Sequence, residues 1–228
     1  MRYIKTIVCL ANSRKNSGRC VAGKEVSLGR VGPWIRPVSG RPTAELSEYD
    51  RQYQDGSEPR VLDMIEIPFK TYKPTGHQVE NHEIDPQYYW RKVGRFSWAK
   101  VRHLVDRDPV LWNRGPSSSN GLNDRVWADS AYELGNSLRF IRPEGAVWCF
   151  QTEEDGKKRV RAEFTYCGVR YRLVVTDPAV EKLLDLLPDG ERSFTSAYLC
   201  VSLGEPYHRW CYKLVASVLT KSLVEGGI

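Results

Sequence analysis

The sequence lacks the short motifs by which the common nucleotide-dependent and metal-dependent enzymes are recognised. It has no Gly-rich phosphate loop ending in Lys-Ser or Lys-Thr, no GxGxxG fingerprint and no HExxH pair. Its six cysteines include no CxxC pair, which excludes the usual zinc-ribbon and thioredoxin patterns. The residues alone therefore assign no cofactor, no metal and no catalytic side chain.

Long apolar runs are missing as well. The first apolar stretch, Ile7–Ala11, is followed at once by the polar letters NSRK, so it is too short for a signal peptide or a membrane span. Most of the cysteines lie inside apolar, strand-like segments, which favours buried free thiols over a disulfide framework. We therefore expect a cytoplasmic protein that has no membrane partner.

Acidic residues are nearly absent from the first 42 positions. Glu25 is the one acid there, against nine lysines and arginines. The formal net charge of the whole chain is only +6, so the basic character is local. A basic segment suits the phosphates of a nucleic acid. The seven tryptophans and twelve tyrosines add aromatic surface of the kind that stacks on bases.

The N-terminal third shows the alternation of apolar and polar residues that is typical of β-strands. The predicted strands are RYIKTIVCLA, CVAGKEVSL, GPWIRPVSG and RVLDMIEIPF. A helical turn is predicted at TAELSEYD, between the third strand and the fourth. The order is therefore three strands, a short helix and another strand.

The C-terminal third predicts a three-stranded meander, then a helix, then two strands. The meander is AVWCFQ, RVRAEFTY and VRYRLVVT, with a tight hairpin at Cys167-Gly168. The helix begins with Asp177 as its cap and Pro178 in its first turn. The last two strands are SAYLCVSL and CYKLVASVL. In an OB barrel the helix falls between the third and fourth strands, as it does here, and the N-terminal third follows a looser version of that order.

The middle of the chain is predicted to be helical. DPQYYWRKV, SWAKVRHLV and DPVLW each begin with the cap residue or the early proline of a helix. The predicted fold class is mainly β with a helical connector (α+β), built from two OB-like small β-barrels. The predicted boundaries are 1–85 for a basic N-terminal barrel, 86–140 for the connector and 141–228 for the C-terminal barrel.

Several long phrases together resemble one known family. They are LANSRKNSGRCVAG, WIRPVS, VLDMIEIPF, HQVEN, NDRV and YLCVSLGEPYHRWCYKLVA. From about Tyr3 to Val218 the sequence resembles a family of bacterial proteins described as dual-OB-domain-containing. The resemblance implies two OB-like barrels and a setting in prokaryotic genome maintenance or defence. It implies no particular activity.

The first loop and the third strand provide the main candidate site. In an OB barrel the second and third strands and the nearby loops form the ligand groove, where cations would follow phosphates. Alternation places Trp34 and Arg36 on one strand face and Ile35 on the other, in the core. Trp34 beside Arg36 would suit a base and its phosphate. The alternative is a solvated basic surface with Trp34 in the core.

Other polar clusters leave their alternatives open. HQVENHE suits hydrogen bonding to base edges, metal binding or a plain polar loop. The segment YYWRKVGRFSWAKVR is basic and aromatic, but it also fits a helix pair with its cations in solvent. Alternation gathers four arginines on one face of the C-terminal hairpin, either as a phosphate-binding face or as a solvated sheet face. These are Arg159, Arg161, Arg170 and Arg172.

A nuclease interpretation of LDMIEIPFK fails on spacing. Lys70 lies four residues beyond Glu66, and Asp63 and Glu66 point to opposite faces of the predicted strand. Nothing near Cys20 marks it as an activated nucleophile. We therefore lean away from an enzyme.

We expect a nucleic-acid-binding protein whose partner is single-stranded DNA or RNA. The alternatives are an enzyme that acts on nucleic acid or a nucleotide, and a scaffold whose basic face docks an acidic protein partner. The residues assigned to nucleic-acid binding are Asn12, Ser13, Arg14, Lys15, Arg19, Trp34, Arg36, His77, Gln78, Asn81, Arg170 and Arg172.

Overall fold

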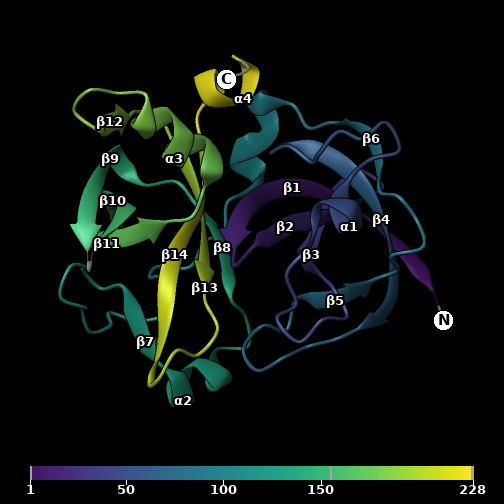
Figure 1. The fold of residues 1–228 in the computed structure, drawn as a ribbon, viewed down its shortest axis with the longest axis horizontal. Helices are drawn as coiled ribbons and strands as arrows, with labels where there is room; N and C mark the ends of the chain where they lie inside the picture. Colours follow the sequence, from purple (N-terminus) through teal and green to yellow (C-terminus); the bar gives the residue numbers. More distant parts are fainter. Residues whose placement is uncertain (1, 155, 227–228) are drawn as a thin grey trace. The chain divides into compact units, whose positions relative to one another are not determined.

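The computed structural model describes residues 2–154 and 156–226, and its ribbon is mainly β-strand (Figure 1). The chain divides into two compact units, Met1–Leu104 (unit 1) and Val105–Ile228 (unit 2). The expectation of a mainly β fold is confirmed.

Unit 1 is built on one sheet that returns to its first strand. Its strands are β1 (Tyr3–Lys15), β2 (Gly18–Ser27), β3 (Arg30–Val38), β4 (Asp63–Tyr72), β5 (Asn81–Ile84) and β6 (Arg91–Arg95). Hydrogen bonding follows the order β1-β2-β3-β5-β4-β6, and β1 also pairs with β4. The β3–β5 pair is parallel. The helix α1 (Glu48–Arg51) lies between β3 and β4 in the chain, as predicted.

The ring of unit 1 closes because β1 is long enough to pair on both of its edges. Ile7 and Val8 are paired with β2 on one side and with β4 on the other. Alternate residues of the ring strands point inward and form the core, which includes Ile7, Ile35, Phe69 and Trp90. The prediction that Ile35 is a core residue is confirmed.

Unit 2 is built on a second, larger sheet. Its strands are β7 (Arg125–Trp127), β8 (Leu138–Ile141), β9 (Glu144–Glu154), β10 (Lys157–Tyr166), β11 (Val169–Val175), β12 (Glu191–Phe194), β13 (Tyr198–Leu203) and β14 (Trp210–Leu219). The order is β12-β9-β10-β11-β14-β13-β8, with β7 added beside β14. The β11–β14 pair is parallel, and β13 and β14 run side by side in yellow in Figure 1.

The two units share one strand order. A meander of three strands, β9-β10-β11, is followed by the helix α3 (Pro178–Asp185) and then by β13 and β14, with the third and last strands parallel. In unit 2 the first strand comes in two pieces. β8 pairs with β13 and β9 pairs with β10, and only Arg142 and Pro143 separate them. Pro143 has no N–H for a ladder, so the strand is interrupted there.

Local sequence explains the turn and the helix of unit 2. Cys167 and Gly168 have φ of 48° and 72°, as a type I′ hairpin requires, so the predicted hairpin is confirmed. The side chain of Asp177 caps α3 by accepting a hydrogen bond from the N–H of Ala179. α4 (Lys221–Glu225) follows β14 at the end of the described chain.

The middle segment, 86–140, is less helical than its sequence predicts. It contains the 3-10 helix η1 (Trp98–Leu104), the helix α2 (Ala128–Ala131) and the 3-10 helix η2 (Tyr132–Leu134). The strands β6 and β7 also lie in it, β8 begins in it, and the division between the units falls inside it, after Leu104.

One predicted helix, DPQYYWRKV, is replaced in part by β6. Lys92 and Arg91 of β6 form ion pairs with Asp63 and Glu66 of β4, on the edge that β6 joins. This pairing with a distant strand overrides the local helical pattern. In DPVLW, where a helix was also predicted, Trp112 has a left-handed φ of 63° that ends any regular helix.

Within the described residues no helix has both the length and the apolarity needed to cross a membrane. The same part of the chain holds no group of three or more His, Cys, Asp or Glu side chains arranged for a metal ion. The cysteines are free thiols, with Cys167 exposed and Cys20 half-buried.

Candidate nucleic-acid interface

The hairpin that joins β1 to β2 carries opposed cations. Arg14 on β1 lies directly across the ladder from Arg19 on β2, and Lys15 is the last residue of β1. Arg14 is exposed, whereas Lys15 and Arg19 are half-buried. A carboxylate also lies nearby, because Glu45 accepts a hydrogen bond from the side chain of Asn16 at 3.4 Å. Like charges directly opposite each other destabilise a ladder, so this arrangement is suited to an added anion.

Asn12 and Ser13 support the hairpin from within. The side-chain amide of Asn12 donates to the carbonyl oxygen of Pro59 at 2.9 Å. The hydroxyl of Ser13 donates to the carbonyl oxygen of Cys20 at 3.3 Å, and Ser13 is only 5% exposed. Both side chains thus make contacts inside the protein, and their assignment as ligand contacts stays a prediction.

Trp34 faces a lysine across the β2–β3 ladder. Trp34 and Lys24 are register partners, and the Lys24 ammonium lies 5.4 Å from the centroid of the Trp34 ring. Trp34 is half-buried, while Lys24 is buried. A cation over an indole face is a favourable contact. Trp34 therefore keeps part of its surface in solvent on the outer face of the second and third strands.

Arg36 shares the strand face of Trp34, as predicted, but it is buried beneath the loop between β4 and β5. The Nη1 of Arg36 donates to Oδ1 of Asn81 at 3.4 Å, and the Asn81 amide donates to Oε1 of Gln78 at 3.4 Å. The N–H of Arg36 also donates to the carbonyl oxygen of Glu80. His77 in the same loop is 1% exposed. The structure thus brings Arg36, Gln78 and Asn81 together, but not in an open groove, because a buried guanidinium needs polar partners.

A Tyr–His pair that the sequence did not single out lies on the same sheet. The hydroxyl of Tyr3 and Nδ1 of His82 are 2.6 Å apart, and the rings of Phe69 and Tyr72 pack against the imidazole. Burial, assisted by the charge of Lys5, lowers the pKa of His82 to about 4. The imidazole is therefore neutral at pH 7 and adds no charge for binding phosphate.

In unit 2 the arginine face predicted from alternation is largely neutralised. Arg172 is paired with Glu163 on the neighbouring strand, and both side chains are partly exposed. Arg161 is buried and donates two hydrogen bonds to Glu154, which lower the pKa of that carboxyl to about 2. Arg170 is exposed. Glu163 is the register partner of Arg172 on the neighbouring strand, whereas the contribution of Glu154 depends on how the β9–β10 hairpin pairs.

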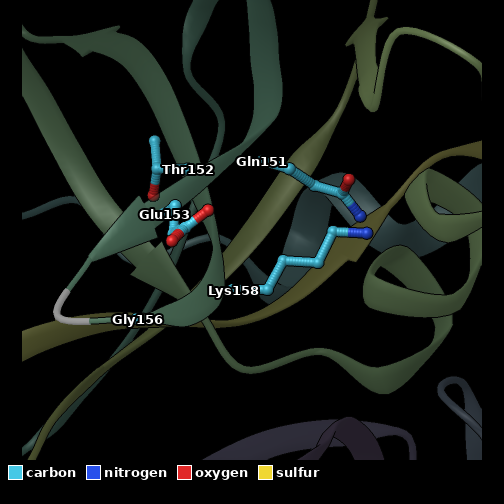
Figure 2. A pocket seen from close by; sticks show the side chains of 5 residues that line it. All are labelled: Gln151, Thr152, Glu153, Gly156 and Lys158. Carbon is cyan, nitrogen blue, oxygen red and sulfur yellow. The ribbon is translucent and has the colours of Figure 1, made fainter.

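A shallow hollow lies beside that hairpin. Figure 2 shows Gln151 and Lys158 extending in the same direction, with their nitrogen atoms close together. Both nitrogens donate to Oδ1 of Asp185 on α3, at 2.7 and 2.8 Å. The hollow is lined by Gln151, Thr152, Glu153, Gly156 and Lys158. Its amide and ammonium groups thus tie the hairpin to α3.

Comparisons with known proteins give one family and one solved structure. The model of a family described as dual OB-containing domain matches residues 5–218. No curated protein matches the chain. A solved structure titled "Crystal structure of the tetrameric p202 HIN2" is similar with 8% sequence identity and a TM-score of 0.31, covering 96% of this chain and 93% of that one. A TM-score at this level does not establish a shared fold.

Proposed function

This chain belongs to the family of dual OB-containing domains, and from that premise we propose that it binds single-stranded nucleic acid through unit 1. OB folds bind oligonucleotides and oligosaccharides on the face of their second and third strands and through the loops after the first and fourth strands. In unit 1 these parts are the β2–β3 face, the β1–β2 hairpin and the β4–β5 loop.

The observation that carries the proposal is the pair of arginines opposed across the β1–β2 hairpin. Arg14 and Arg19 are held at one ladder position, at the loop that OB folds use for ligands, with Lys15 next to them. A phosphate between the two guanidinium groups would accept charge-assisted hydrogen bonds from both and release counterions. A sugar without phosphates offers no such gain, so nucleic acid is the preferred ligand class.

Trp34 supplies the base contact in this proposal. Its partly exposed ring lies on the β2–β3 face with a lysine against it. Stacking on such a ring requires a base whose face is free, which a single strand offers and a duplex hides. The buried contacts of Arg36 with Asn81 hold the β4–β5 loop against the third strand, so Arg36 shapes the surface rather than touching phosphate.

The test is the salt dependence of oligonucleotide binding by the full chain. Replacing Arg14 and Arg19 by Gln should weaken binding to a single-stranded oligomer and flatten the plot of log K against log salt by about 0.7, the value for the one phosphate contact that is lost. The control replaces Lys157 and Lys182, two exposed lysines of unit 2, and removes the same charge. Fluorescence anisotropy on single-stranded and duplex oligomers provides the measurement.

Three results would contradict the proposal. An unchanged slope in the arginine variant, or an equal change of slope in the lysine control, would show that the phosphates do not bind at this hairpin. Tighter binding of the duplex than of the single strand at equal salt would contradict the single-stranded ligand. Replacing Trp34 by Ala tests the base contact separately, because stacking is worth about 1–3 kcal/mol per base and its loss leaves the salt slope unchanged.

A further inference from the structure

Unit 2 contains a stacked column made of two tryptophans and an arginine. Trp127 on β7 and Trp210 on β14 are register partners, with ring centroids 3.7 Å apart and planes 28° from parallel. The guanidinium carbon of Arg125, also on β7, lies 4.1 Å from the centroid of the Trp210 ring. One face of a ring has no room for two planar groups at such distances, so Arg125 and Trp127 cover opposite faces of Trp210.

The column ends in an accessible indole. Trp210 lies in the middle and is half-buried, whereas Trp127 is 47% exposed. Arg125 is fixed at the other end, because its Nη2 donates to the carbonyl oxygen of Ser117 at 2.8 Å. The column is thus held in place at Arg125 and exposed to solvent at Trp127. One more planar group can stack on the Trp127 ring.

The column does not belong to the apolar core of unit 2. Side chains alternate along β7 and β14, and the neighbours Val126 and Cys211 point the other way, into a buried cluster with Leu203. Trp127 and Trp210 therefore occupy the outward face of this ladder. A large aromatic pair kept outside the core marks a contact surface more often than a packing requirement.

The loop between β13 and β14 adds to the same surface. This loop follows the fourth strand of the OB order, one of the two loops through which such folds bind ligands. Tyr207 in it is 65% exposed, lies edge-on to His208 at 4.5 Å, and is joined to Trp210 by backbone hydrogen bonds. The aromatic column and the ligand loop are thus one continuous structure.

We infer that this column is a second binding surface, on which an unpaired nucleobase stacks against the exposed face of Trp127. The chain segments that carry the column have balanced formal charges, because Arg125 and Arg209 are accompanied in sequence by Asp129 and Glu205. A balanced surface gains little from releasing phosphate counterions. The contact therefore comes from stacking and depends little on salt, unlike the contact at the β1–β2 hairpin of unit 1.

The experiment compares an ordinary single-stranded oligomer with an abasic oligomer of the same length, using the full chain. Replacing Trp127 by Ala should weaken binding of the ordinary oligomer by about 5- to 150-fold, the range that corresponds to losing one stacked base. Binding of the abasic oligomer and the salt slope should not change. Replacing Trp127 by Phe, which keeps a ring, should restore most of the affinity, and thermal melting shows that both variants are folded.

Tyr132 serves as the matched control, because it is 58% exposed on η2 but takes no part in the column. Replacing Tyr132 by Ala should leave affinity unchanged. Intact affinity in the Trp127 variants, equal losses on the abasic oligomer, or a changed salt slope would each overturn the inference. A change of oligomeric state without loss of affinity would also overturn it, in favour of a protein partner.

The result expected for the Trp127 variant differs from the result expected for the Arg14 and Arg19 variant of unit 1. The Arg14 and Arg19 variant changes the salt slope and leaves Trp127 intact, whereas the Trp127 variant changes the affinity at constant slope. A wild-type chain that binds neither oligomer would overturn both proposals.

Discussion

The two units follow one strand order but close it differently. In unit 1, β1 is continuous and pairs on both edges around Ile7 and Val8, with a bulge just beyond, between Cys9 and Ala11. In unit 2 the two pairings are made by two separate strands: β8 pairs with β13, and β9 pairs with β10. Arg142 and Pro143 separate these two strands. In this strand order the first strand pairs with the second strand on one edge and with the fourth strand on the other. A β-bulge in unit 1 and a break in unit 2 each let the first strand bend enough to make both pairings.

The two units also differ in charge. Unit 1 has 18 lysines and arginines against 11 acids, and unit 2 has 16 against 17. In unit 2, on the β10–β11 face, Arg161 is paired with Glu154 and Arg172 with Glu163. One strand order therefore presents a basic hairpin in the first unit and a neutralised face in the second.

The loop after the fourth strand shows the same divergence. In unit 1 it is polar and folds onto Arg36, where His77, Gln78 and Glu80 are buried. In unit 2 it is exposed and carries Tyr207 next to the tryptophan column. This contrast explains why we assign phosphate contacts, beside the base contact of Trp34, to unit 1 and base stacking without phosphate contacts to the tryptophan column of unit 2.

The largest effect is expected from breaking the closure of unit 1. Replacing Val8 by Pro should destabilise the fold by more than about 3 kcal/mol, because the N–H of Val8 belongs to a strand that is paired on both edges and proline removes that donor and adds a clash. Chemical denaturation of the variant measures the loss of unfolding free energy.

The matched change in unit 2 replaces Pro143 by Ala at the natural break. It should lower the unfolding free energy by less than the Val8 substitution does, because Pro143 is buried but neither β8 nor β9 includes it and no ladder hydrogen bond is lost. Equal losses of unfolding free energy from the two substitutions would contradict this comparison. They would show that stability depends on the break at Pro143 as much as on the continuous strand at Val8.

A smaller effect, of opposite sign in the two units, is expected from their helix caps. In unit 2 the carboxylate of Asp177 accepts from the N–H groups of Ala179 and Val218, and its burial raises the pKa of Asp177 to about 6. In unit 1 the N-cap of α1 is Ser47, and Asp50 completes its capping box. Burial of Asp50 acts to raise its pKa, but hydrogen bonds from Arg41 and Ser47 lower the pKa overall. One cap therefore favours its protonated form and the other its charged form.

The two caps should respond to pH in opposite directions. The folded state holds the proton of Asp177 more tightly than the unfolded chain does, so its contribution to stability is complete below about pH 4 and is lost as pH rises through about 6. For Asp50 the contribution is present above about pH 4 and is lost as the pH falls further.

Melting curves of the wild type, Asp177→Asn and Asp50→Asn between pH 3 and 7 test this pair. The stability advantage of the wild type over Asp177→Asn should grow by up to about 3 kcal/mol on acidification from pH 7 to 4, at about 1.4 kcal/mol per unit of pKa shift. A difference between these two proteins that stays constant with pH would mean that Asp177 binds protons equally in the folded and the unfolded states, so that folding does not raise its pKa.

Sequence patterns were sufficient wherever the structure depends on neighbours in the chain. The hairpin at Cys167, the cap at Asp177 and the inward position of Ile35 all follow from local spacing, and each was predicted. The resemblance added the pair of OB units, which the family match now shows.

Features that depend on distant segments were not predicted. β6 forms because Arg91 and Lys92 meet acids on a strand that lies far back in the chain. The burial of Arg36 is decided by a loop that follows β4. Trp127 and Trp210 stand 83 positions apart, and only the β7–β14 pairing makes them one surface. Alternation within a strand contains no information about which strand will lie beside it.

The smallest predicted effect would make unit 2 more like unit 1. Replacing Glu163 by Gln removes the acid that pairs with Arg172, and stability should change by less than about 1 kcal/mol because the pair is partly exposed. If the arginine face follows the phosphates of a bound strand, the freed Arg172 should steepen the plot of log K against log salt by about 0.7. Replacing Glu225, whose exposed ion pair with Lys221 lies on α4, provides the control and should leave the slope unchanged. An unchanged slope in the Glu163 variant would exclude Arg172 from the phosphate track. Contact between unit 2 and nucleic acid would then rest on the tryptophan column alone.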